Sequence, residues 1–114
     1  MVGRILILEP EPEIRELLMH VAARLGHDAV TNAADLHGDI DAVVLEPQSS
    51  RGLARAEQIR RRFPDVPIVC TSILPPSRAT RELRPVAHLV KPFALDELER
   101  VLARALDAAS VGRV

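Results

Sequence analysis

Several residue types are scarce in this sequence of 114 residues, and each scarcity excludes a class of protein. A single cysteine excludes an internal disulfide framework and a zinc site built from several cysteines. Only two residues are aromatic, both of them phenylalanine, so the stacking platform of single-stranded nucleic-acid binders is not expected. No apolar run approaches the ~20 residues that a membrane span needs, so no membrane association is expected. The core must therefore be aliphatic.

An excess of charge of one sign is also lacking. Fifteen basic and sixteen acidic residues leave a net charge of -1, which argues against direct nucleic-acid binding, because that needs a basic surface. The composition predicts one cytoplasmic domain over residues 1–114, with residues 107–114 as a tail. Lys91 is the only lysine. We interpret it as a position that needs a compact ammonium rather than a planar guanidinium, with chance as the alternative.

Apolar runs alternate with helical patterns along the chain. Unbroken apolar runs at residues 5–8 and 42–45 predict strands buried on both faces. Further strands are predicted at residues 28–31, 66–70 and 86–90. Apolar positions spaced by three and four predict amphipathic helices between and after them, most clearly from Pro12 to Leu25 and from Leu95 to Leu106. The segment 32–40 and the proline-rich segment between Ser72 and Pro85 are short. The second and fourth helices should therefore be short as well.

The residues that follow each strand are the candidate site. Repeated strand–helix alternation predicts an α/β fold, with a parallel sheet covered by helices on both faces, and ligands in such sheets bind beyond the carboxyl ends of the strands. Glu9, Glu46, Ser72 and Lys91 stand at these ends. If their strands are neighbours, Lys91 should neutralise Glu46 or Glu9. A solvated strand edge is the alternative interpretation. Cys70 lies in an apolar strand and is expected in the core.

Three segments resemble the receiver domain of bacterial response regulators. Residues 4–18 resemble its opening, residues 66–72 its fourth strand and switch hydroxyl, and residues 89–93 its Lys-Pro-Phe segment. The resemblance covers essentially the whole chain. It implies a three-layer flavodoxin-like (βα)5 fold with a parallel five-stranded sheet of order 2-1-3-4-5. It also implies a role in two-component signal transduction.

The resemblance assigns roles to individual residues. Members of the family accept a phosphoryl group on an aspartate after strand three, hold Mg²⁺ with an acidic pair after strand one, and contact the phosphoryl group through a Thr or Ser and a Lys. Glu46 stands at the phosphoacceptor position. Ser72 matches the switch hydroxyl, Lys91 matches the lysine, and His88 matches the aromatic switch position, with an ordinary surface histidine as its alternative.

Two departures from the family pattern affect the chemistry directly. Glu46 carries one methylene more than aspartate, and a displacement of about 1 Å is severe for in-line phosphoryl transfer. Pro10 stands where the second acid of the pair is expected, and it offers no metal ligand. Glu9 and Glu11 remain as an acidic pocket, although Glu11 also suits a solvent-facing acid at a helix start.

We therefore predict a degenerate receiver domain, a pseudo-receiver that is not an enzyme and holds no cofactor or metal. It would act as a phosphorylation-independent protein-interaction module in which Glu46 meets Lys91 or Ser72 and imitates part of the charge of a phosphate. The alternative is a functional phosphoacceptor receiver that uses an unusual acidic site with Mg²⁺. An unrelated α/β enzyme is less consistent with the sequence, because no glycine-rich phosphate loop follows the first strand.

Partners are expected on two surfaces. The resemblance implies that the face formed by helix 4, strand 5 and helix 5 receives a signalling partner, a kinase or effector, with homodimer formation left open. Arg78, Arg81 and Arg84 should decorate this face beside His88. A second basic cluster is either a solvated helix face or a docking site for an acidic partner; it comprises Arg51, Arg55, Arg60, Arg61 and Arg62.

Overall fold

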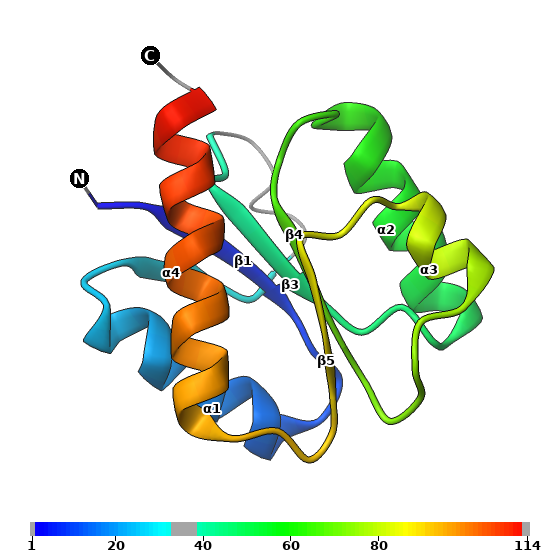
Figure 1. Ribbon diagram of the computed structural model, residues 1–114, viewed down its shortest axis with the longest axis horizontal. Coiled ribbons are helices and arrows are strands. Elements are labelled where there is room, and N and C mark those ends of the chain that lie inside the picture. Colours follow the sequence, from blue (N-terminus) through cyan, green and yellow to red (C-terminus); the bar gives the residue numbers. More distant parts are fainter. Residues whose placement is uncertain (1, 33–38, 113–114) are drawn as a thin grey trace.

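The chain folds as alternating strands and helices in a computed structural model that describes residues 2–32 and 39–112 (Figure 1). The strands are β1 (Arg4–Leu8), β2 (Asp28–Val30), β3 (Ala42–Leu45), β4 (Ile68–Ser72) and β5 (Ala87–Val90). The helices are α1 (Pro12–Arg24), α2 (Ser50–Arg62), α3 (Arg78–Glu82) and α4 (Leu95–Gly112). The helices that the receiver family counts as its third, fourth and fifth are thus α2, α3 and α4.

The strands form one parallel sheet of order β2-β1-β3-β4-β5, which confirms the predicted flavodoxin-like topology. In the register, Leu8 lies opposite Leu45, Leu45 lies opposite Cys70, and Ser72 lies opposite Val90. The carboxyl ends of β1, β3, β4 and β5 therefore meet along one edge of the sheet.

Two helical layers cover the sheet: α1 and α4 lie on one face, and α2 and α3 lie on the other (Figure 1). Successive strand side chains point to opposite faces, so neighbouring residues of one strand enter different cores. Ile7 packs in the core that contains Leu102 of α4, and Leu6 packs in the core that contains Ile59 of α2. The unbroken apolar strands are explained by this burial on both faces.

Local signals fix the helix ends next to the site. Gly26 follows α1 with a φ of 82°, a left-handed conformation that glycine adopts without strain. Ser49 caps α2, because its Oγ accepts a hydrogen bond from the Gly52 amide at 2.9 Å. A Cβ atom on Gly52 would lie 2.2 Å from the carbonyl oxygen of Glu46. A glycine here therefore lets α2 begin directly against the end of β3.

The predictions about individual elements can be compared with the structure. β4 extends past the predicted end at Cys70, because Thr71 and Ser72 still pair with β5. α4 continues to Gly112, past residue 107 where the tail was predicted to begin, because no glycine or proline interrupts the helix before Gly112. The short helix before β5 is confirmed as the five-residue α3. The expectation for the second helix falls largely on residues 33–38, outside the described residues.

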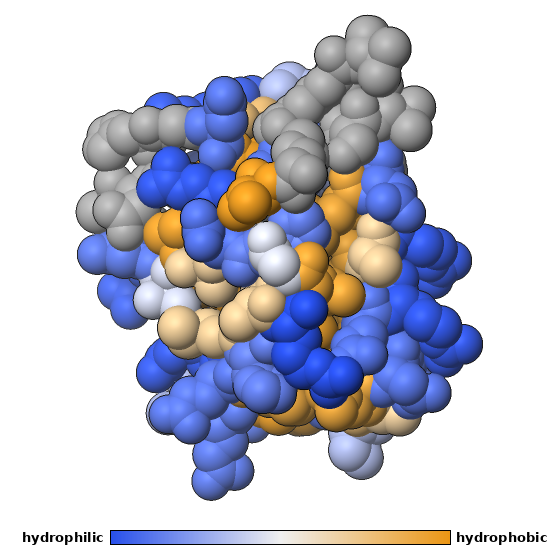
Figure 2. Space-filling view, turned by 90° about the vertical axis from the view of Figure 1, so that its left-hand side faces the viewer, coloured by the Kyte–Doolittle hydropathy of each residue, from blue (hydrophilic) through white to orange (hydrophobic). Residues whose placement is uncertain are grey.

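The outer surface follows the amphipathic patterns. Hydrophilic side chains cover most of the face shown in Figure 2, with small apolar areas between them. Within residues 2–32 and 39–112, no helix combines the length and apolarity needed to cross a membrane. The polar faces of the amphipathic helices are exposed, as their periodicity predicts.

Candidate functional site

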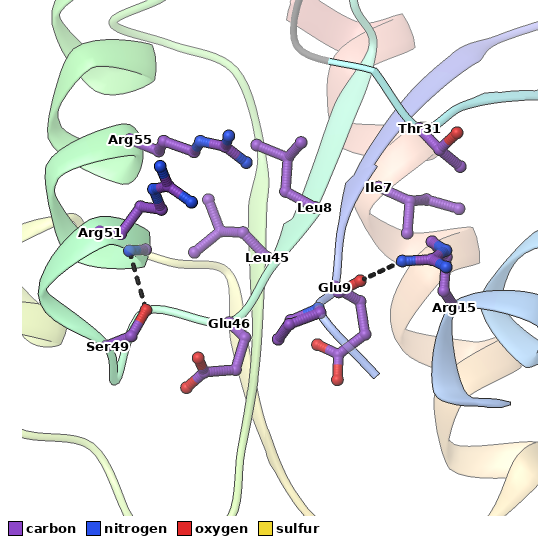
Figure 3. Close-up of a pocket in the computed structure, with 12 residues that line it drawn as sticks. Ile7, Leu8, Glu9, Arg15, Thr31, Leu45, Glu46, Ser49, Arg51 and Arg55 are labelled. Atoms are coloured by element: carbon purple, nitrogen blue, oxygen red, sulfur yellow. Dashed lines mark hydrogen bonds between the residues drawn. The ribbon is translucent and has the colours of Figure 1, made fainter. Parts of the chain in front are cut away.

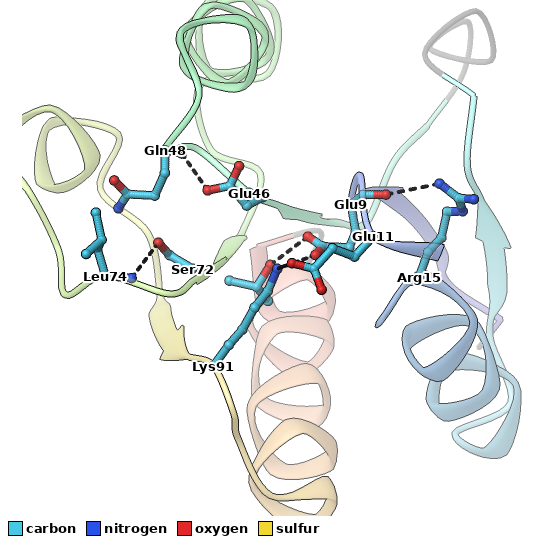
Figure 4. Close-up of polar contacts among 9 residues, drawn as sticks. Glu9, Glu11, Arg15, Glu46, Gln48, Ser72, Leu74 and Lys91 are labelled. Atoms are coloured by element: carbon cyan, nitrogen blue, oxygen red, sulfur yellow. Dashed lines mark hydrogen bonds and ion pairs between the residues drawn. The ribbon is translucent and has the colours of Figure 1, made fainter. Parts of the chain in front are cut away.

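Glu9 and Glu46 follow β1 and β3 and lie at the carboxyl edge of the sheet. Between them and the helices α1 and α2 is a cavity of about 220 Å³ (Figure 3). Lys91 follows β5 and reaches the same edge from its other end (Figure 4). Glu9, Glu46 and Lys91 thus share one edge of the sheet, and individual contacts decide which of them pair.

Lys91 pairs with Glu9. Its Nζ forms an ion pair with Glu9 Oε1 and lies 3.4 Å from Glu11 Oε1 (Figure 4). The Lys91 side chain is 8% exposed and that of Glu9 is 0% exposed, whereas that of Glu11 is 57% exposed. Because β3 and β4 lie between β1 and β5, this ion pair spans the edge of the sheet. The sequence left two partners open for Lys91, and the structure selects Glu9.

The second oxygen of Glu9 is also bonded. The Oγ1 of Thr71 donates to Glu9 Oε2 at 3.2 Å, and Thr71 is fully buried in β4. Both oxygens of this buried carboxylate therefore have protein partners, which is what burial of a charge requires.

The pair keeps Lys91 cationic. Burial alone lowers the pKa of the Lys91 ammonium, but the hydrogen bond and charge of Glu9, helped by Glu11, outweigh it and raise the pKa above its ordinary value. The ammonium charge is thus balanced inside the protein.

Glu46 has a different environment from the one predicted. Its Oε1 accepts a hydrogen bond from the backbone amide of Gln48 at 2.7 Å. Within the described residues, Glu46 bonds neither Lys91 nor Ser72. The expectation that Glu46 meets one of these groups is therefore wrong. The physical reason is local: the backbone amide of Gln48, two residues further along the chain, donates a hydrogen bond to the Glu46 carboxylate and holds it next to its own loop.

Ser72 and His88 both bond to the backbone of Leu74, in the loop between β4 and α3. The Leu74 backbone amide donates to Ser72 Oγ at 3.0 Å (Figure 4). The Leu74 carbonyl lies 2.9 Å from His88 Nε2. A carbonyl only accepts, so Nε2 carries the proton in this contact. The backbone amide of Lys91 also donates to the Ser72 carbonyl at 2.7 Å. The two predicted switch residues therefore contact the amide and the carbonyl of the same loop residue.

The residues present do not fit the Mg²⁺ that the family resemblance implies. Glu9 is engaged by Lys91 and Thr71, the side chain of Pro10 has no ligand atom, and Glu46 is bonded to its own loop. In the described part of the chain, no group of three or more His, Cys, Asp or Glu side chains could hold a metal ion. Mg²⁺ needs near-octahedral oxygen ligands, and this edge does not supply them.

Three residues of the site were not predicted in these roles: Thr71, Gln48 and Arg15, whose Nη1 donates to the Glu9 carbonyl at 3.2 Å. Only Thr71 leaves a usable signal, because a hydroxyl near the end of an otherwise apolar strand needs a partner when it is buried. Cys70 lies in the core as predicted, and burial raises the pKa of its thiol to about 12.

Comparisons with known proteins place this geometry in context. No family model matches the chain. The chain is 27% identical to the regulatory protein AtoC of Escherichia coli (strain K12) over 122 residues, which span 96% of this chain and 26% of AtoC. It therefore spans about a quarter of the curated relative that it matches.

Solved structures give the same picture. NtrX from Brucella abortus is 28% identical, with a TM-score of 0.84 over 99% of this chain and 28% of NtrX. The separately solved receiver domain of NtrX matches over 98% of its length, with a TM-score of 0.77. The response regulator TrrA from Thermotoga maritima, solved with Mg²⁺ and BeF, is 29% identical, with a TM-score of 0.74 over 92% of this chain and all of TrrA.

The sheet order and the helical layers define a three-layer α/β protein of the flavodoxin-like class. Within that class, the similarity to AtoC, to NtrX and to TrrA supports a response-regulator receiver domain. Glu9, Glu46, Ser72 and Lys91, which the sequence resemblance assigns to a phosphorylation site, lie along one edge of the sheet.

Proposed function

We propose that the chain acts in two-component-type signal transduction as a receiver domain that works without phosphorylation, through contacts with other proteins. The observation that carries this proposal is that the charged groups at the edge of the sheet already have partners within the protein. Lys91 is bonded to Glu9, and Glu46 is bonded to the Gln48 amide. The cation and the acceptor-position carboxylate are thus both engaged within the protein.

Phosphoryl transfer depends on positioning and on charge stabilisation. It needs an in-line nucleophile, and in this family it needs a metal that neutralises the developing charge. TrrA was solved with Mg²⁺ and BeF, whereas this chain has Pro10 in the acidic pair and a longer acceptor side chain. These substitutions support a domain that has kept the architecture of the reaction site and lost its chemistry.

The surface formed by α3, β5 and α4 is the proposed partner site, for a kinase or an effector. Apolar side chains are exposed there and in the adjoining loops: Leu74, Val86, Val90 and Leu95. Exposed apolar groups of this kind are typical of protein interfaces. Of the arginines predicted on this face, Arg78 pairs with Glu82 at 3.3 Å and Arg84 donates to the Pro64 carbonyl at 3.3 Å. Both are thus engaged within the protein.

The test is incubation with acetyl phosphate and Mg²⁺, followed by intact-mass measurement. We expect no adduct on the native chain. Glu46→Asp tests the acceptor alone, and Glu46→Asp combined with Pro10→Asp also restores the second acid. Reaction of the double variant alone would identify the missing metal ligand as the main block. A covalent phosphate on Glu46 of the native chain would overturn the proposal in favour of an unusual phosphoacceptor site.

A further inference from the structure

The basic cluster on α2 does not form one solvated face. Arg60 turns inward and donates to backbone carbonyls, among them those of Leu83 and Val66. Arg51 and Arg55 instead line the cavity next to Glu46, and Arg15 of α1 lines it from the opposite side (Figure 3). Three guanidinium groups from two helices therefore border one cavity of about 220 Å³.

These three cations have no carboxylate partner among the described residues. The bond found for Arg15 is to the Glu9 backbone carbonyl. The nearby acids are engaged elsewhere, Glu9 with Lys91 and Glu46 with the Gln48 amide. Figure 3 shows their carboxylates pointing away from Arg51 and Arg55. Glu9 and Glu46 also line the cavity, but Lys91 balances the charge of Glu9. Three arginines therefore face one remaining carboxylate, that of Glu46, and the lining carries net positive charge.

The chemistry of the lining selects the type of ligand. A guanidinium presents a planar fork of donors that matches the oxygens of a phosphate, and a dianion can engage more than one fork at once. Thr31 also lines the cavity. A volume of about 220 Å³ corresponds to several waters at ~30 Å³ each, which suits a small anion rather than a protein segment.

We propose that this cavity reversibly binds a phosphate group, free or as the ester of a small molecule, between α1 and α2. The arginines of both helices hold it through charge-assisted hydrogen bonds. This site does not require the covalent step at Glu46 and is independent of the proposed function.

Calorimetric titration with inorganic phosphate, at constant ionic strength and without Mg²⁺, tests the proposal. We expect saturable binding to the native chain and about tenfold weaker binding to Arg55→Gln, because one charged fork is lost. Arg61→Gln is the matched control, since Arg61 is an exposed arginine of the same helix that does not line the cavity. Absence of saturable phosphate binding, or equal weakening in both variants, would overturn the proposal.

Two further measurements sharpen the result. Adenosine monophosphate, compared with adenosine and with inorganic phosphate, distinguishes an ester ligand from the free ion. The thermal midpoint of the native chain should rise with phosphate and not with chloride at the same ionic strength, because a ligand that binds only the folded state stabilises it. An equal response to both salts would contradict a specific site. Reversible binding leaves no mass change after dialysis, so this test and that of the proposed function can fail separately.

Discussion

Lys91 and Arg60 are both partly buried cations, but they have different kinds of partner. Lys91 meets carboxylates at the carboxyl edge of the sheet. Arg60 donates to backbone carbonyls where α2 approaches the end of α3, including those of Val66 at 2.7 Å, Leu83 at 2.8 Å and Pro64 at 2.9 Å. One contact balances charge, and the other satisfies hydrogen bonds only.

The pKa directions express this difference. Carboxylates raise the pKa of Lys91, whereas burial first, and then the charge of Arg84, lower the pKa of Arg60. Carbonyl dipoles suit a guanidinium, which keeps its proton and offers five donors in a fixed fork. A compact ammonium suits a position between two carboxylates. The comparison supports the interpretation of Lys91 as a position selected for its ammonium.

Breaking the carboxylate contact should have the largest effect. Glu9→Gln leaves a nearly buried ammonium with only the exposed Glu11 as a partner, so we expect the free energy of unfolding to fall by about 3 kcal/mol. Urea denaturation measures this change. Glu16→Gln, which changes an exposed acid of the nearby helix α1, is the control and should change stability little. Equal effects of the two variants would show that the ion pair does not stabilise the fold.

Breaking the carbonyl contact should cost less. Arg60→Met keeps an apolar stem and removes the donors, and we expect a loss of about 2 kcal/mol in the free energy of unfolding, because water can reach some of the freed carbonyls. Arg61→Met on the same helix controls for the removal of charge. Hydrogen exchange adds a local reading: amides of α3 should lose protection in Arg60→Met and keep it in Arg61→Met. The same protection in both variants would refute the link between α2 and α3.

High pH should separate the two contacts. Because the folded-state pKa of Lys91 is raised, its contribution to stability is fully present below its unfolded value, about 10.4, and is lost as the pH rises through the folded value. The chain has no tyrosine, but the buried thiol of Cys70, with a pKa of about 12, causes a loss in the same direction. The comparison is therefore made in a Cys70→Ala background.

In that background, stability should decline above about pH 10.4 more steeply than in Cys70→Ala combined with Lys91→Met. Adding Arg60→Met should lower stability already at pH 8, because its hydrogen bonds to carbonyls are lost, and should leave the decline that depends on Lys91 in place. Denaturant midpoints across this pH range measure both effects. Parallel pH profiles with and without Lys91 would contradict the raised pKa.

The smallest effect is expected at the outer carboxylate. Glu11 is more than half exposed and lies 3.4 Å from the ammonium, so Glu11→Gln should lower the free energy of unfolding by about 0.5 kcal/mol. Added salt should remove most of this difference. An effect as large as that of Glu9→Gln would mean that the two acids share Lys91 equally.

Much of the fold could be predicted because strands and helices leave repeating patterns of apolar residues in the sequence. Unbroken aliphatic runs and helical spacing predicted the parallel sheet, and parallel strands bring their carboxyl ends to one edge. That placed Glu9, Ser72 and Lys91 together without any knowledge of contacts. The predicted short fourth helix also follows from a local signal, since prolines surround the segment.

The remainder depends on single contacts that no pattern encodes. Both Glu9 and Glu46 were candidates for Lys91, and the choice depends on the capture of Glu46 by the Gln48 amide. The inward turn of Arg60 depends on carbonyls at the ends of α2 and α3, which the sequence does not reveal. The sequence therefore offers no reason to separate the arginines of α2, although Arg60 bonds inward and Arg55 lines the cavity.

The central claim is that the charge of Lys91 is balanced internally by Glu9. Since Lys91 is the only lysine, selective lysine labelling gives a single side-chain resonance, and its NMR titration reports this pKa directly. The account predicts a midpoint above about 10.4 in the native chain and a lower midpoint in Glu9→Gln. Midpoints near 10.4 in both proteins would contradict it.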